Sequence, residues 1–183
     1  MRTIFAAQGL RVFDVDELAT HGGSLRVFAS RAEARTRMET PRVAELLSRE
    51  REAGVQTLAY YADFKAQAER VKLDLLRFLI EQKRAGHTVA AYGAAAKGNT
   101  LLNYAGIRSD LLSFVCDAAP SKQGRFLPGS HIPILAPEAL VDRSPDFVLI
   151  LPWNIRGEIE RQLADLRAEG VRFVVAVPRL EVA

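Results

Sequence analysis

The chain has 183 residues, 49% apolar and 26% charged, which is typical of a globular protein and excludes disordered and fibrous classes. Its 25 basic and 22 acidic residues leave a net charge of +3, too small a surplus to predict a nucleic-acid or membrane partner. The one cysteine, Cys116, has no second Cys or His at metal-ligand spacing, so we expect no metal site and a reducing compartment. The longest apolar run, residues 147–153, is far shorter than the roughly 20 residues of a spanning helix, and the N-terminus lacks a signal-peptide pattern. These features predict a soluble, cytoplasmic protein.

Residues 1–30 predict a short helix followed by a β-hairpin. Residues 1–8 are typical of the last turns of a helix that ends at Gly9. Residues 10–15 and 24–29 then alternate between apolar and polar side chains, as half-buried strands do, and a glycine-bearing loop joins them. A two-stranded hairpin is marginally stable alone in water, so we expect its edges to be exposed or paired with another chain.

Residues 31–56 predict a linker followed by a helix. The stretch from residue 31 to Pro41 is polar and lacks apolar periodicity. Pro41 suits the first position of a helix, and this helix continues through Val43, Leu46 and Leu47.

Residues 57–183 predict an α/β domain. An apolar stripe at helical spacing predicts one long helix from about Thr57 to Gly86. Short β-branched runs then alternate with predicted helices, including one from Asn154 to Glu169, which is typical of a parallel sheet covered on both faces. The simplest topology is a Rossmann-like sheet of about four strands.

The strongest local signal is the stretch 92–100, Tyr-Gly-Ala-Ala-Ala-Lys-Gly-Asn-Thr, where a predicted strand runs into a helix. Small residues there let backbone N–H groups approach an anion closely, and Lys97 adds a positive charge. The spacing matches neither G-x-G-x-x-G nor a Walker A loop. It predicts a phosphate or nucleotide site, and the alternative is a tight turn whose small residues serve only helix-on-sheet packing.

Further candidate ligand residues follow two other predicted strands. Asp117 ends the second strand of the sheet, where dinucleotide-binding folds place a ribose-binding acid, although it also suits a turn. Lys122 lies in the loop that follows. Trp153 and Asn154 come after a third strand, where Trp153 either stacks on a base or covers the sheet end, and Asn154 either contacts ligand or caps a helix.

No catalytic constellation lies wholly within the chain. His21, in the polar loop of the predicted hairpin, is a weak catalytic candidate, because a lone histidine in a turn is more often structural. The sequence shows no Ser-His-Asp pattern, carboxylate pair or His and Cys cluster, so chemistry confined to this chain is not supported.

Four stretches, residues 9–26, 91–103, 117–134 and 149–154, together resemble the C-terminal half of bacterial sugar C-methyltransferases that act on nucleotide-linked deoxysugars. In that family a zinc-binding segment and an S-adenosylmethionine-binding domain precede a Rossmann-like domain that holds the nucleotide diphosphate of a 4-keto sugar. The resemblance implies removal of a proton next to the keto group, followed by methyl transfer to that carbon. It also implies that the diphosphate is lined by Gly93, Lys97, Asn99 and Thr100, and that Asp117, Lys122 and Trp153 are nucleoside contacts. The other candidate substrate-binding residues are Ala94, Ala95 and Asn154.

The sequence departs from the family pattern in three respects. The zinc-ligating cysteines, the glycine-rich methyl-donor loop and the Glu-His catalytic motif are missing from these 183 residues. By the resemblance, residues 1–30 correspond to the last helix and hairpin of a methyltransferase sheet. We therefore expect the S-adenosylmethionine-binding domain to be absent here, and the partner to be a separate methyltransferase subunit or a second copy joined through the hairpin.

The alternative is a non-enzymatic Rossmann-like module that binds NAD or another nucleotide. Ala95 argues against a dinucleotide, because it stands where close approach of a pyrophosphate favours a second glycine.

Overall fold

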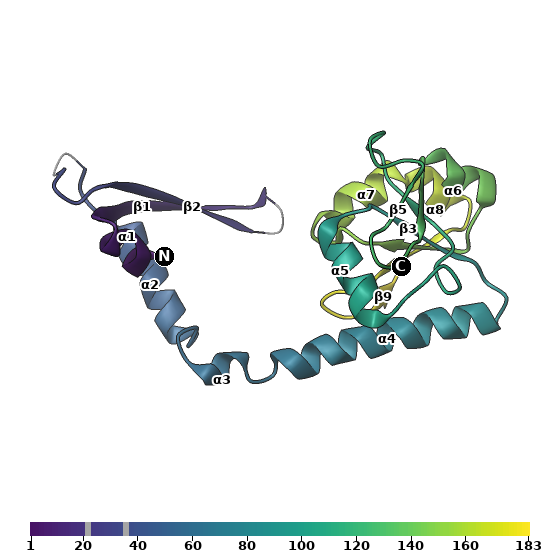
Figure 1. Cartoon of the computed structure of the whole chain (residues 1–183), viewed down its shortest axis with the longest axis horizontal. Coiled ribbons are helices and arrows are strands. Elements are labelled where there is room, and N and C mark those ends of the chain that lie inside the picture. Colours follow the sequence, from purple (N-terminus) through teal and green to yellow (C-terminus); the bar gives the residue numbers. More distant parts are fainter. Residues whose placement is uncertain (21–22, 35–36) are drawn as a thin grey trace. The chain divides into compact units, whose positions relative to one another are not determined.

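The computed structural model describes residues 1–20, 23–34 and 37–183, which form two compact units, Met1–Phe64 and Lys65–Ala183 (Figure 1). His21 lies outside the described residues. The domain boundaries predicted at residues 30 and 56 remain predictions. The division between the two compact units falls after Phe64.

The first unit is built on the predicted antiparallel hairpin. Strand β1 (Leu10–Leu18) pairs with β2 (Ser24–Arg31), with Leu10 opposite Arg31 and a bulge between Val12 and Asp14. Helices α1 (Arg2–Ala7), α2 (Pro41–Glu52) and α3 (Leu58–Tyr61) complete the unit. The hairpin confirms the sequence prediction for this segment.

Helix α2 covers one face of the hairpin. Val43 on α2 packs against Val12 and Val15 of β1, and all three are at most 6% exposed. The amphipathic pattern that predicted α2 thus supplies the hairpin with a small hydrophobic core.

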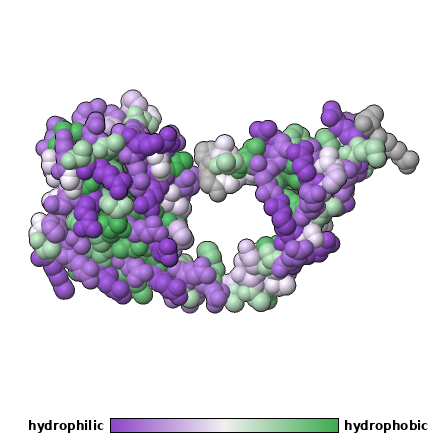
Figure 2. Space-filling model, turned by 180° about the vertical axis from the view of Figure 1, so that it is seen from behind, coloured by the Kyte–Doolittle hydropathy of each residue, from purple (hydrophilic) through white to green (hydrophobic). Residues whose placement is uncertain are grey.

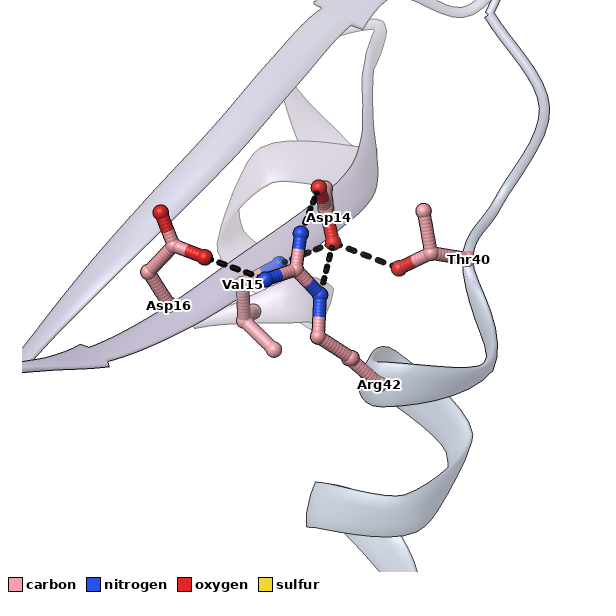
Figure 3. Close-up of polar contacts among 5 residues, drawn as sticks. All are labelled: Asp14, Val15, Asp16, Thr40 and Arg42. Atoms are coloured by element: carbon pink, nitrogen blue, oxygen red, sulfur yellow. Dashed lines mark hydrogen bonds and ion pairs between the residues drawn. The ribbon is translucent and has the colours of Figure 1, made fainter.

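Polar contacts hold the start of α2 against β1 (Figure 3). The Arg42 guanidinium forms ion pairs with both Asp14 and Asp16, and Thr40 donates a hydrogen bond to the Asp14 carboxylate. The Thr40 hydroxyl and then Arg42 lower the pKa of Asp14, because both stabilise its charged form. Thr40, near the end of the predicted linker, is therefore hydrogen-bonded to the hairpin.

The second unit is an α/β sandwich around a mostly parallel sheet, as predicted. The sheet has the strand order β5-β6-β4-β3-β7-β8-β9, in which β5 and β9 are antiparallel edge strands. The strands of the sheet are β3 (Val89–Tyr92), β4 (Val115–Cys116), β5 (Arg125–Phe126), β6 (Pro133–Leu135), β7 (Phe147–Ile150), β8 (Arg172–Val175) and β9 (Glu181–Val182). The helices are α4 (Phe64–Arg84), α5 (Ala96–Ala105), α6 (Glu138–Arg143), the 3-10 helix η2 (Trp153–Ile155), α7 (Arg156–Gln162) and α8 (Ala164–Ala168).

Both faces of this sheet are covered by helices. Val89 and Ala91 of β3 belong to a core cluster shared with α4 and α5, whereas Ala90 and Tyr92 belong to a cluster shared with α6, α7 and α8. This division explains why the strands read as continuous apolar runs rather than as alternating ones. On the face drawn in Figure 2, hydrophilic residues cover most of the surface of each unit, and smaller hydrophobic areas are interspersed among them.

Three elements differ from the sequence prediction. The sheet has five parallel strands rather than about four, because residues 133–135, for which the sequence predicts no strand, pair with β4 as β6. The predicted helix from Asn154 to Glu169 is interrupted at Leu163, and the helix predicted from Thr57 is broken at residues 62–63. The short strand depends on a tertiary partner, which periodicity does not detect.

None of the helices within the described residues is both long enough and apolar enough to cross a membrane.

Candidate functional site

The candidate site lies where three parallel strands end at one edge of the sheet. Strand β3 lies between β4 and β7, and the chain continues from β3 through β4 and β6 on one side before returning to β7 and β8 on the other. The direction in which the chain adds successive strands to the sheet therefore reverses between β3 and β7. In open α/β sheets, ligands bind outside the carboxyl ends of the strands at such a reversal.

The turn from β3 into α5 requires small residues for packing. Gly93 has a φ of +89°, and a Cβ at this position would overlap the ring of Pro152. A Cβ at Gly98, one turn into α5, would lie 2.6 Å from the Leu151 Cβ. Both glycines thus allow the turn and α5 to approach the segment after β7 closely.

Two backbone N–H groups of this turn have partners within the protein, and three at the start of α5 have none in the described part of the chain. The Ala94 N–H donates to Asp117 Oδ2 at 2.7 Å, and the Ala95 N–H donates to the Gly93 carbonyl at 2.8 Å. The N–H groups of Ala96, Lys97 and Gly98 open helix α5, where no preceding turn supplies a carbonyl, and Ala95 provides no side-chain cap. The backbone donors without a partner among the described residues are therefore at residues 96–98 rather than at 94 and 95, and of these three residues only Ala96 and Lys97 are not buried.

Lys97 lies between α5 and the segment after β7. Its ammonium group donates a hydrogen bond to Asn154 Oδ1 and lies 5.1 Å from the centre of the Trp153 ring. No carboxylate among the residues that the structure describes forms an ion pair with it. The structure therefore brings three predicted site residues together, and Lys97 keeps an uncompensated positive charge at the helix N-terminus.

Asp117 and Lys122 form a second group beside the turn. Asp117 Oδ2 accepts hydrogen bonds from the Ala94 N–H and from Lys122 Nζ at 3.0 Å, while Oδ1 accepts one from the Ala119 N–H. Burial is the largest influence on the pKa of Asp117 and raises it, but the hydrogen bonds from Ala119, Lys122 and Ala94 together lower the pKa below its usual range. Asp117, 8% exposed, thus fastens the β3–α5 turn to the end of β4.

Asn99 and Thr100 point to local partners on α5. The Thr100 hydroxyl donates to the Ala96 carbonyl, and the Asn99 side-chain oxygen accepts from Asn103 Nδ2 at 3.3 Å. Neither residue contacts Lys97 or Asp117 through a hydrogen bond in the described part of the chain.

Asn103 is a structural contact that the sequence did not single out. It also donates to the Pro128 carbonyl at 2.9 Å, and a Cβ on Gly129 would overlap its side chain. Asn103 therefore links α5 to the turn before β6. The spacing of four residues between Asn99 and Asn103 was the available signal, because such residues share a helix face.

Cys116, at the end of β4, is fully buried. Burial raises the pKa of its thiol to about 12, so the reactive thiolate form is disfavoured at neutral pH. Cys116 therefore lacks the properties of a nucleophile.

The described residues suit neither a metal ion nor, at the Lys97 site, the methyl donor S-adenosylmethionine. Within residues 1–20, 23–34 and 37–183, no three His, Cys, Asp or Glu side chains gather in a way that would hold a metal ion. The site at Lys97 does not fit S-adenosylmethionine, because the sulfonium of that donor is cationic and would lie beside an uncompensated ammonium.

Comparison with known proteins identifies the family. The sequence profile described as the C-methyltransferase C-terminal domain matches residues 19–178. The chain belongs to this family. A relative, C-methyltransferase NovU of Streptomyces niveus, is 39% identical over 176 residues, which are 96% of this chain and 42% of the relative. The chain thus spans about two fifths of the length of that C-methyltransferase, and the resemblance inferred from the sequence is confirmed.

Proposed function

We propose that this C-methyltransferase C-terminal domain binds the diphosphate of a nucleotide-linked keto-deoxysugar. The observation that carries the proposal is Lys97, whose charge has only neutral partners at the N-terminus of α5 and at the reversal of strand order. An ammonium and free backbone N–H groups at one point are the donors that a diphosphate requires. The family match supports a substrate of a C-methyltransferase.

In this proposal the chain supplies the sugar-nucleotide half of an S-adenosylmethionine-dependent C-methyltransferase. The Lys97 ammonium and the N–H groups of Ala96 and Lys97 hold the diphosphate, and Trp153 offers an aromatic face near the same point. The donor and the base that removes the proton next to the keto group belong to a methyl-donor domain. Methyl transfer then occurs where the two halves hold donor and acceptor in line.

The alternative ligand, NAD, is less consistent with the geometry. A dinucleotide-binding acid must accept hydrogen bonds from ribose hydroxyls. Both oxygens of Asp117 already accept hydrogen bonds from the protein, and Lys122 neutralises the carboxylate. A role for Asp117 in holding the turn accounts for these contacts without a ribose.

Parallel calorimetric titrations of the full chain with a thymidine diphosphate keto-sugar and with NAD test the proposal. We expect saturable binding of the sugar nucleotide and no binding of NAD in the same concentration range. Binding of NAD alone would favour the dinucleotide module, and binding of neither would contradict a nucleotide site at Lys97.

The hairpin supports the second part of the proposal, a partner that carries the methyl-donor domain. The Thr40 N–H donates to the Phe13 carbonyl beside β1, whereas β2 pairs only with β1 among the described residues. An open strand edge is a template for pairing with another chain. We propose a separate methyltransferase polypeptide as that chain, and a second copy of this chain is the competing occupant. Sedimentation analysis of the chain alone distinguishes them, since a dimer would favour the second copy.

A further inference from the structure

The turn after β7 determines where the Lys97 side chain lies. A lysine side chain is long and flexible, and an exposed lysine samples many rotamers. Lys97 instead meets Asn154 at its ammonium group and the Trp153 ring beside it. These contacts restrict Lys97 before any ligand is present, which reduces the entropy lost when a ligand binds.

The chemical nature of these partners preserves the charge. An amide oxygen accepts one N–H of the ammonium group and leaves two donors and the full positive charge. Lys122, at the same edge of the sheet, shows the contrasting arrangement, because it pairs with the Asp117 carboxylate at 3.0 Å. Of these two lysines, Lys97 is the one whose charge is held by neutral groups.

We propose that Asn154 is a positioning residue for Lys97, and that it directs the ammonium group toward a diphosphate at the N-terminus of α5. This inference rests on the proposed function, since it assigns the role of Asn154 within that site. Trp153 forms the second support, with its ring beside the ammonium. Asn154 then contributes to affinity through Lys97 rather than by its own contact with the ligand.

A double-mutant cycle with thymidine diphosphate as the probe tests this role. We expect Asn154→Ala to weaken binding about twofold to tenfold, the effect of losing one ordinary hydrogen bond. In a Lys97→Ala background, Asn154→Ala should cause no further loss, because the side chain that it positions is gone. Asn154→Leu, which keeps the size but removes the acceptor, should behave like Asn154→Ala.

Asn154→Asp is the matched charge control. It preserves the shape but places a carboxylate against Lys97. We expect at least about tenfold weaker binding, because this carboxylate neutralises Lys97 and repels the negatively charged diphosphate. Trp153 is the one tryptophan in the chain, so its emission reports directly on the neighbouring ammonium group. Without ligand, Asn154→Ala and Lys97→Ala should shift that emission in the same direction.

The outcomes separate the two levels of the proposal. Unchanged affinity in Asn154→Ala, or an equal loss in both backgrounds, would overturn the positioning role and leave diphosphate binding intact. Absence of thymidine diphosphate binding by the wild-type chain would overturn the proposed function, and this inference with it. Circular dichroism of each variant confirms that the fold is retained.

Discussion

At the scale of single residues, the turn after β3 has features of both interpretations of its sequence, a tight packing turn and an anion site. Gly93 and Gly98 are needed for close packing against Pro152 and Leu151, as the packing interpretation requires. Lys97 has no such role, because its charged end lies over Trp153 and its partner is an amide. Packing therefore explains the glycines, whereas the lysine is the residue to which the proposed anion binding assigns a role.

The first prediction concerns the charge of Lys97. Lys97→Ala should weaken thymidine diphosphate binding by about 1 to 3 kcal/mol, the range for loss of a hydrogen bond to a charged group. The loss should shrink at high salt, because ions screen the interaction. Calorimetric titration at two salt concentrations measures it. Lys65→Ala is the control, since it removes the same charge from an exposed lysine on α4; equal losses in the two variants would contradict a specific site.

The second prediction separates backbone strain from packing. Gly93 and Gly106 both have positive φ, at +89° and +72°, but only Gly93 has a neighbour that a Cβ would meet. Gly106→Ala should cost about 1 kcal/mol of unfolding free energy from strain alone. Gly93→Ala should cost a further 1 to 3 kcal/mol, roughly, from overpacking against Pro152. Urea unfolding followed by Trp153 emission compares them, and equal midpoints would show that Pro152 yields easily.

At the scale of elements, Asp117 connects β4 to the β3–α5 turn, and this connection should depend on pH. Folding lowers the pKa of Asp117, so the folded state favours its charged form. This stabilisation is fully present above the unfolded pKa of about 3.9 and is lost as the pH falls through the lower folded pKa. Asp117→Asn lacks this contribution.

The third prediction follows from the lowered pKa of Asp117 in the folded state. Between about pH 5 and pH 2, the wild-type chain should lose more stability than Asp117→Asn, and the two curves should converge at the acid end. Urea midpoints measured by Trp153 emission across this range provide the test. Parallel curves for the two proteins would show that the Asp117 contacts contribute no pH-dependent stability.

The fourth prediction concerns the contact between α2 and the hairpin. Val43→Ala removes two methyl groups from a core of few residues, and should destabilise β1 and β2 by about 1 to 3 kcal/mol. Hydrogen exchange should therefore speed up in β1 and β2 and remain unchanged in β3 and β7. Ala44→Ser, at a neighbouring exposed position of α2, is the control. Equal acceleration in β3 would show that the two compact units unfold together.

The sequence predicted the elements that carry their own periodicity. The hairpin, α2 and the strands β3, β7 and β8 each show an apolar pattern that follows from which face is buried. Strand β6 has only three residues and begins at a proline, so its pairing with β4 follows from tertiary context. The Lys97–Asn154 contact spans 57 residues, and only the strand order places its two ends together.

At the scale of the whole molecule, the two compact units divide the features of a C-methyltransferase C-terminal domain. The unit Lys65–Ala183 contains the Lys97 site, and the unit Met1–Phe64 contains the hairpin with its open β2 edge. In the proposed function, the first feature binds an anionic ligand and the second pairs with a strand of another chain.

The fifth prediction is that the 183-residue chain alone does not transfer methyl groups. Transfer requires a bound sulfonium in line with the acceptor carbon and a base within hydrogen-bond reach of the proton that it removes. The Lys97 site repels a sulfonium, and the sequence contains neither a glycine-rich donor loop nor a Glu-His pair. Incubation with labelled S-adenosylmethionine and a thymidine diphosphate keto-sugar should show no turnover, and activity should appear when a polypeptide carrying the donor-binding half is added. Turnover by the chain alone, abolished by His21→Ala, would show instead that the hairpin loop supplies a catalytic base.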